Sequence, residues 1–334
     1  MKRRDAIVLL GSAAAAWPLA TGAQQSRKSA RIALISQSPP IDRATGRRER
    51  LWSAFFEELA RLGYAEGRNL AVDWRDSAGD TFHARALARD IAAMAPDAVF
   101  TPDQRMAAEL KTAAPSLPIV AIFADPVSFG IAASLARPGG NVTGFSIDVG
   151  PEVGRKRVAW LKEAVPHISR MAWLTPRRHW QSRFRDIVKT SADAVGLAIV
   201  GAVVDPPGDE ADYRRAFAAA TREKADAINA SPALENLTQR RLIAALALEQ
   251  RLPAMCAYRE NAEAGAMMAY AVDLAHMFRG AAEYVGRILD GAHPGSLPIQ
   301  QPTKFELIVN LVTAKALRLT LPESVLSRAD TVIE

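Results

Sequence analysis

The chain contains almost none of the residues and motifs on which metal and nucleophilic catalysis depend. Its single cysteine, Cys256, excludes an internal disulfide and a thiolate metal cluster, and its apolar surroundings predict a buried, inert thiol. The patterns GxxxxGKS/T, GxGxxG, HExxH, GxSxG and CxxC are all absent. The five histidines lie far apart, so that no two of them share one helical turn. We therefore predict no catalytic residue, no metal site and no cofactor.

Long apolar runs are also scarce, and the longest lies at the N-terminus. Three basic residues precede an apolar stretch over 6–20, which is too short for a stable membrane span. Small residues at 21–23 then form a cleavage site, so we predict a signal peptide over 1–23 that is cleaved near Ala23. This places the mature chain in the periplasm and leaves both the Sec and the twin-arginine routes open. The alternative is a cytosolic protein with an apolar N-terminal helix.

The chain carries only a modest excess of positive charge. The formal charge is +6, and removal of the signal peptide leaves about +4. Lys and Arg are scattered among Asp and Glu, with short basic clusters at 43–50 and 177–185. Nucleic-acid binding requires a continuous basic face with stacking aromatic residues, which this pattern does not provide. We expect no nucleic-acid partner and a monomeric protein.

One strand–helix pattern occurs twice along the chain. The apolar run at 31–36 has a counterpart at 170–175, and the run at 97–101 has one at 226–231. The offsets between such counterparts are about 130–140 residues, as expected for a duplicated unit with loop insertions. The length of 334 residues also allows about two domains. We predict two similar α/β lobes with a cleft between them.

Each lobe is predicted to be a doubly wound parallel sheet, because short apolar strands alternate with amphipathic helices. The expected elements of lobe one are strands 31–36, 69–75, 97–101, 118–123 and 141–145, with helices 47–62, 81–94 and 104–114. Those of lobe two are strands 170–175, 198–204, 226–231 and 253–257, with helices 181–195, 210–223 and 236–250. The C-terminal part adds strands 265–270 and 305–310 and helices 274–289, 313–319 and 322–329.

Turn-forming residues indicate where the chain crosses between the lobes. A cluster at 137–144 precedes a strand that leaves lobe one, so the first crossing is expected near 146–150. Further hinge strands are expected near 262–268 and 292–302. Lobe one then spans 30–146 and is completed by about 268–292. Lobe two spans 150–262 and is completed by about 300–334.

The functional residues are expected at the carboxyl ends of the strands, because open parallel sheets bind ligands there. The candidates are Ser36, Gln37, Thr101, Asp103, Asp125, Thr143, Pro176, Ser231 and Tyr258. Hydroxyl, carboxylate and aromatic groups of this kind suit a small zwitterion, with Thr101, Asp125, Thr143 and Ser231 as polar contacts and Tyr258 as an apolar wall. The alternatives are structural: helix caps at Ser36, Thr101 and Ser231, a turn at Asp125, and interlobe packing at Tyr258.

Seven short segments of the chain form a distinctive set: 17–20 (WPLA), 23–25 (AQQ), 62–69 (LGYAEGRN), 125–127 (DPV), 135–144 (LARPGGNVTG), 301–307 (QPTKFEL) and 310–317 (NLVTAKAL). Together they resemble the ABC-transporter substrate-binding family of the tryptophan/tyrosine-binding type. The resemblance covers essentially the whole chain. It departs from the family pattern at 100–103 (FTPD), where Asp103 adds a carboxylate, and at 266–271 (AMMAYA).

The resemblance implies a type I periplasmic-binding-protein fold that closes on a small ligand and docks on an ABC transporter permease in the inner membrane. The ligand class it implies is an amino acid or a related small acid, aromatic ones included. Three alternatives stay open at this point. The fold could serve as a ligand-sensing partner of a membrane signalling protein, as an exported α/β enzyme, or as the sensor core of a DNA-binding regulator, although the signal peptide occupies the place of a DNA-binding headpiece.

Overall fold

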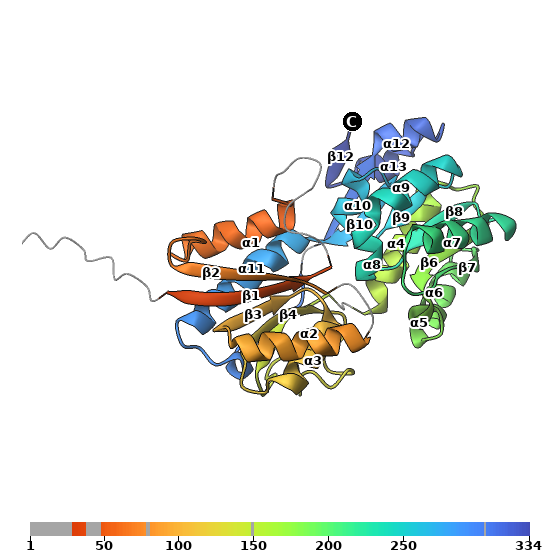
Figure 1. The fold of residues 1–334 in the computed structure, drawn as a ribbon. Coiled ribbons are helices and arrows are strands. Elements are labelled where there is room, and N and C mark those ends of the chain that lie inside the picture. Colours follow the sequence, from red (N-terminus) through yellow and green to blue (C-terminus); the bar gives the residue numbers. More distant parts are fainter. Residues whose placement is uncertain (1–28, 38–47, 78–80, 148–149, 304) are drawn as a thin grey trace, which may run out of the picture.

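The chain forms two α/β lobes that lie side by side, each built on its own sheet (Figure 1). The computed structural model describes residues 29–37, 48–77, 81–147, 150–303 and 305–334. The predicted signal peptide over 1–23 lies outside the described residues. Among the described helices, none is both long and apolar enough to cross a bilayer.

Lobe one is built on a five-stranded parallel sheet with the order β2-β1-β3-β4-β5. Its strands are β1 (Ala30–Ser36), β2 (Leu70–Asp76), β3 (Ala98–Thr101), β4 (Ile119–Phe123) and β5 (Val142–Ser146). Helices cover both faces, as parallel sheets require. They are α1 (Arg50–Arg61) and α11 (Leu274–Leu289) on one face and α2 (Thr81–Met94) and α3 (Gln104–Ala113) on the other (Figure 1).

Alternation of side chains along the strands of lobe one creates two separate cores. In β1, Ile32 and Leu34 are buried in the cluster formed with α1 and α11, whereas Ala33 and Ile35 are buried in the cluster formed with α2 and α3. The two-residue period of a strand explains this division, because successive side chains point to opposite faces. The sheet is thereby held as a rigid layer, with its loops at the two edges.

Lobe two repeats this order and extends it. Its sheet has the order β12-β11-β10-β9-β8-β6-β7, in which β6 to β10 reproduce the arrangement of β1 to β5. The strands are β6 (Arg170–Pro176), β7 (Ala198–Val204), β8 (Ala227–Ala230), β9 (Ala254–Cys256), β10 (Met268–Val272), β11 (Phe305–Asn310) and β12 (Thr331–Ile333). Only β11 among the described strands runs antiparallel to its neighbour, β10. The duplication and the predicted fold class of two doubly wound lobes are confirmed.

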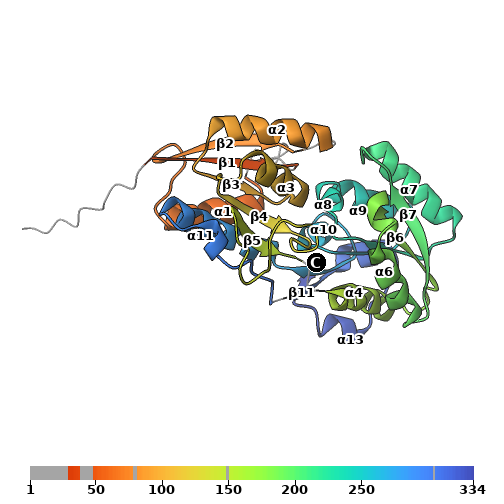
Figure 2. The same ribbon diagram turned by 90° about the horizontal axis from the view of Figure 1, so that it is seen from below.

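The helices of lobe two also lie on both faces of its sheet (Figure 2). Helix α4 (Pro151–Ala164) packs on one face and α7 (Glu210–Arg222) on the other, with separate apolar clusters beneath them. The remaining helices are α5 (Arg177–Trp180), α6 (Arg183–Asp193), α8 (Leu234–Thr238), α9 (Arg240–Glu249), α10 (Arg259–Glu263), α12 (Leu311–Ala316) and α13 (Glu323–Leu326), and a 3-10 turn covers Pro294–Ser296.

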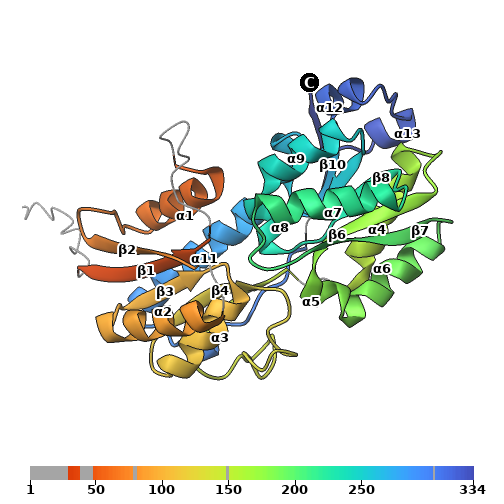
Figure 3. The same ribbon diagram turned by 45° about the vertical axis from the view of Figure 1, so that its right-hand side comes forward.

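The chain passes between the lobes three times. It leaves lobe one between β5 and α4, returns after β10, where α11 packs beside α1 (Figure 3), and crosses again before β11. The first crossing, between Ser146 and Pro151, and the third, between the 3-10 turn and Phe305, are close to the predicted positions. The second lies after Val272, later than the predicted 262–268, because β10 begins only at Met268 and completes the parallel part of the lobe-two sheet before the chain leaves.

Several predicted elements have different bounds in the structure. The expected helix 181–195 is shortened to α6 (Arg183–Asp193), since Ser182 caps α6 by accepting a hydrogen bond from the Phe184 N–H at 3.3 Å. The expected strand 265–270 is shifted to 268–272, and helix 236–250 is divided into α8 and α9. Strand β12, which pairs with β11, was not expected, because three residues are too few for a periodic pattern.

Candidate ligand-binding site

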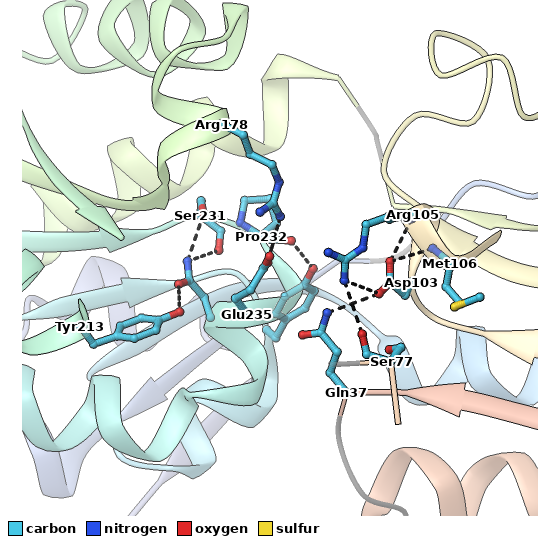
Figure 4. Close-up of polar contacts among 12 residues, drawn as sticks. Gln37, Ser77, Asp103, Arg105, Met106, Arg178, Tyr213, Ser231, Pro232 and Glu235 are labelled. Carbon is cyan, nitrogen blue, oxygen red and sulfur yellow. Dashed lines mark hydrogen bonds and ion pairs between the residues drawn. The ribbon is translucent and has the colours of Figure 1, made fainter. Parts of the chain in front are cut away.

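The carboxyl ends of the two sheets face each other, and polar side chains from both lobes gather there (Figure 4). Parallel strands end at one edge of their sheet, so the loops that follow them converge on the same region. We call this region the interlobe site. The labelled side chains that define it are Gln37, Asp103 and Arg105 from lobe one, and Arg178, Ser231 and Glu235 from lobe two.

Asp103 organises the lobe-one side of the interlobe site. It is the N-cap of α3, and its Oδ1 accepts hydrogen bonds from the backbone N–H groups of Arg105 at 2.9 Å and Met106 at 3.3 Å. Its Oδ2 accepts a hydrogen bond from the Gln37 side-chain amide at 3.3 Å and lies 3.6 Å from the Arg105 guanidinium. One carboxylate therefore fixes the helix start and holds an amide and a cation at the end of β1.

Asn236 organises the lobe-two side. It is 1% exposed, and its amide donates to the backbone oxygen of Leu174 at 3.2 Å and to the backbone oxygen and hydroxyl of Ser231 at 3.0 and 3.1 Å. Its own carbonyl oxygen accepts a hydrogen bond from the Tyr213 hydroxyl at 2.8 Å. A fully satisfied buried network of this kind holds the loop after β8 rigidly against β6.

An aromatic residue and an ion pair complete the lobe-two side. The Tyr258 hydroxyl donates to the backbone oxygen of Pro232 at 2.8 Å, and Tyr258 is only 4% exposed. Burial raises the pKa of this phenol, so Tyr258 stays neutral. Arg178 pairs with Glu235 at 2.8 Å. Burial, together with the charge of Arg178, lowers the pKa of the adjacent His179 to about 4.

Among the residues that the structure describes, three ion pairs join the lobes. Arg183 of α6 lies 3.2 Å from the Asp125 carboxylate, Arg50 of α1 lies 2.7 Å from Glu260, and Arg240 of α9 lies 2.5 Å from Glu49. Partial burial by itself raises the pKa of Asp125, but hydrogen bonds from Ser128 and the charge of Arg183 lower it overall. The Arg183–Asp125 pair is the most exposed of the three, so it contributes roughly 0–1 kcal/mol.

Buried polar atoms without partners are concentrated near the interlobe site. Within the part of the chain that the structure describes, three buried side-chain oxygens have no hydrogen-bond partner: Ser77 Oγ, Thr175 Oγ1 and Glu260 Oε2. Ser77 directly follows β2, and Thr175 is the penultimate residue of β6. Folded proteins satisfy most buried polar groups, so such exceptions mark places where a ligand or water completes the bonding.

The predicted site residues occupy different positions at this edge. Gln37, Asp103, Ser231 and Tyr258 lie at or just beyond strand ends and form the contacts described above. Ser36 and Pro176 are the last residues of β1 and β6, and both are buried. Asp125 follows β4 and faces Arg183 of the other lobe. A role for any of them in ligand contact stays a prediction.

The hydroxyl groups of Thr101 and Thr143 both form hydrogen bonds within lobe one. Both are completely buried. The Thr101 hydroxyl accepts a hydrogen bond from the Asp103 N–H at 3.2 Å, and the Thr143 hydroxyl donates to the backbone oxygen of Leu297 at 2.7 Å. Thr143 is the second residue of β5, whose carboxyl end is Ser146, so it is not at the strand end where it was expected.

Several charged and amide residues at the interlobe site were not predicted. They are Arg105, Arg178, Glu235 and Asn236. All four stand one turn or less inside the helices that follow β3, β6 and β8. The first turn of such a helix borders the same edge as the strand end, so the sequence signal for these residues is their position within one helical turn after a strand.

Further pockets lie elsewhere among the described residues, and two of them are well defined by their lining. One, of about 320 Å³, is lined by Asp97, Pro118 and Asn141, which directly precede β3, β4 and β5, so it opens at the amino ends of the lobe-one strands. The other, of about 370 Å³, lies beside the third crossing, between Lys156 and the stacked rings of Tyr270 and Phe305. Among the described residues, no group of three or more His, Cys, Asp or Glu side chains is arranged to hold a metal ion.

The sequence over 47–333 matches the family of ABC transporter substrate binding proteins. The chain belongs to this family. The tyrosine-binding protein of Clostridioides difficile (strain R20291) is 21% identical to it over 295 residues, which cover 88% of this chain and 81% of that protein. The predicted family resemblance is thus confirmed.

Several solved structures share the fold. A conserved domain protein from Vibrio cholerae is 27% identical, with a TM-score of 0.79 over 91% of this chain and 100% of that one. An ABC domain from Streptococcus pneumoniae, solved in complex with L-Trp, is 22% identical, with a TM-score of 0.78 over 92% of this chain and 100% of that one. A substrate-binding protein from Clostridium difficile, solved in a ligand-free, open form, is 20% identical, with a TM-score of 0.62 over 91% of this chain and 99% of that one.

Proposed function

We propose that this protein is the periplasmic solute-binding component of an ABC importer. It binds an amino acid or a related small acid, aromatic ones included, between its lobes and releases it unchanged to an inner-membrane permease. Ligand binding shifts the equilibrium between open and closed arrangements of the lobes, and the permease recognises the closed form. The protein acts as a monomer and needs no cofactor.

The observation that carries this proposal is the arrangement of polar groups at the interlobe site. Two sheets present their carboxyl ends to each other, and unpartnered buried oxygens belong to Ser77, Thr175 and Glu260 near that region. Three crossings connect the lobes, which is the connection that a hinge requires. Family membership and the L-Trp-bound and tyrosine-binding relatives support the ligand class.

A thermal-shift panel on the chain without residues 1–23 tests the proposal. The panel contains the aromatic, aliphatic and charged amino acids, their decarboxylated amines and small organic acids. A ligand present at 100 times its Kd stabilises the folded state by about 2.7 kcal/mol, which raises the melting temperature by several degrees. We expect such a rise for one chemical class, with the compound recovered intact by mass spectrometry. No rise for any compound, or conversion of the bound compound, would contradict the proposal.

A further inference from the structure

Arg157 is a buried cation without an anionic partner. It stands in the second turn of α4 and is only 9% exposed. Among the residues that the structure describes, its only hydrogen bond runs from Nε to the backbone oxygen of Tyr270 at 2.9 Å. No described carboxylate forms an ion pair with it, and its two terminal nitrogens have no hydrogen-bond partner there.

This cation stays charged in the folded protein. Burial lowers the pKa of Arg157 to about 10, which is still well above neutral pH. A buried guanidinium is costly unless an anion compensates its charge and accepts its hydrogen bonds. In contrast, the neighbouring Arg155 on the same helix is half exposed and pairs with Glu152. On this helix the exposed Arg155 has an anionic partner, whereas the buried Arg157 has none among the described residues.

The surroundings of Arg157 place its charge at the carboxyl edge of the lobe-two sheet. Its electrostatic neighbours are Cys256, Tyr258 and Tyr270. Cys256 is the last residue of β9 and Tyr258 follows two residues later, at the edge where the Tyr258 hydroxyl contacts Pro232. The same edge faces lobe one (Figure 4). The terminal N–H groups of Arg157, which have no partner and are not fully enclosed, therefore lie near Tyr258 and Tyr270 at this edge.

We propose that Arg157 binds the carboxylate of the transported solute. The planar guanidinium offers two parallel N–H groups that match a carboxylate, and burial strengthens the pair because water is excluded. The neighbouring Tyr258 ring supplies an apolar wall for the remainder of the molecule. The substrate class that follows is a small aromatic or apolar acid with a free carboxylate. This inference rests on the proposed function and adds the group that selects acids over amines.

The test compares acids with their decarboxylated amines. Affinities of L-tryptophan, tryptamine, L-tyrosine, tyramine and any other acid found in the thermal-shift panel are measured by calorimetry on the wild type, Arg157→Gln and Arg157→Lys. Loss of a charge-assisted pair predicts that Arg157→Gln weakens acid binding on the order of 100-fold and amine binding by less than about threefold. Arg157→Lys retains the charge but not the fork, so we expect an intermediate loss. If the Arg157→Gln variant does not fold, the acid and amine affinities of Arg157→Lys decide the question.

Arg155→Gln is the matched control, because it removes the same charge from an exposed position on the same helix. It should leave both affinities within about twofold of the wild type, since a paired surface charge contributes little. Equal acid-to-amine preference in the wild type and the Arg157 variants would overturn the inference while the proposed function stands. A lower melting temperature with that preference unchanged would show a purely structural cation. If no acid binds the wild type, the inference fails; if no compound binds at all, the proposed function fails with it.

Discussion

Arg183 of lobe two lies 3.2 Å from the carboxylate of Asp125 in lobe one, so the lobes are joined by an ion pair next to the interlobe site. The arginine side chain is 67% exposed, whereas that of Asp125 is 15% exposed. An exposed pair of this kind contributes little free energy and weakens further in salt. The contact therefore biases the equilibrium between open and closed lobes without locking it.

Asp125→Asn and Arg183→Gln should each weaken ligand binding by about two- to fivefold, because each removes up to about 1 kcal/mol from the closed form. The double variant should be no weaker than either single one, and the effect should vanish in 1 M salt. Calorimetric titration at two salt concentrations measures this. If Asp125 instead contacts the ligand directly, Asp125→Asn will abolish binding while Arg183→Gln does not.

Asn236→Ala should lower the free energy of unfolding by about 3 kcal/mol or more, because it leaves the buried hydroxyl of Tyr213 and the groups of Ser231 without partners. Ser231→Ala removes only one partner of the Asn236 amide and should cost about 1 kcal/mol. Urea denaturation of both variants measures the difference. Equal stabilities would show that Asn236 does not hold the loop after β8 against β6.

Gly144→Ala should prevent correct folding or lower stability by more than about 4 kcal/mol. Gly144 has φ of 141°, and an added Cβ would lie 1.9 Å from the backbone oxygen of Ala121. Gly154 in α4 is the control, since nothing lies within 4 Å of its Cβ position and alanine favours a helix by about 0.5–1 kcal/mol. Soluble yield and thermal melting separate the two variants. A well-folded Gly144→Ala protein would disprove the close approach of β4 and β5.

His179 should make the protein less stable in mild acid. The ordinary pKa of the group is 6.5, whereas burial, together with the charge of Arg178, lowers it to about 4 in the folded protein. The unfolded chain therefore binds this proton at a higher pH, and the free energy of unfolding falls as the pH drops from about 6.5 to about 4. The loss is on the order of 2 kcal/mol. His179→Gln should flatten this part of the stability profile. Parallel profiles for the two proteins would contradict the burial of the imidazole.

Cys256 should not react with thiol reagents in the native protein. It is completely buried, and burial raises the pKa of its thiol to about 12. Only the thiolate is an effective nucleophile, so modification by an aromatic disulfide should await unfolding. Absorbance at the product wavelength, with and without denaturant, measures this. Rapid native labelling would contradict the packing around β9.

The sequence predicts the elements more completely than it predicts the contacts between them. Helices α2 and α11 and strand β7 have the predicted bounds, because periodicity and flanking glycines are local signals. Strand-end reasoning located Asp103 and Tyr258 at the carboxyl edge. It misplaced Thr143, which lies inside the strand predicted over 141–145 and is the second residue of β5 rather than a residue at its end.

Contacts between the lobes could not be predicted from the sequence. Arg50 and Glu260 are 210 residues apart, and their pairing depends on how two separately folded sheets are placed by the crossings. The unpaired state of Arg157 also has no sequence signal, because basic residues in amphipathic helices are most often solvated. Prediction of the site therefore depends on the three-dimensional arrangement, whereas most of the fold can be predicted from the sequence alone.

The distance between the lobes tests the central claim most directly. Phe82 of α2 is 79% exposed and Leu248 of α9 is 43% exposed, so cysteines at these positions can carry a donor and an acceptor dye while the buried Cys256 stays unlabelled. Energy transfer is then recorded as the stabilising acid from the thermal-shift panel is added. We predict a saturable change in transfer efficiency with the same Kd as calorimetry, and a much weaker response in Arg157→Gln. Saturable binding with no change in transfer would contradict closure of the lobes around the solute.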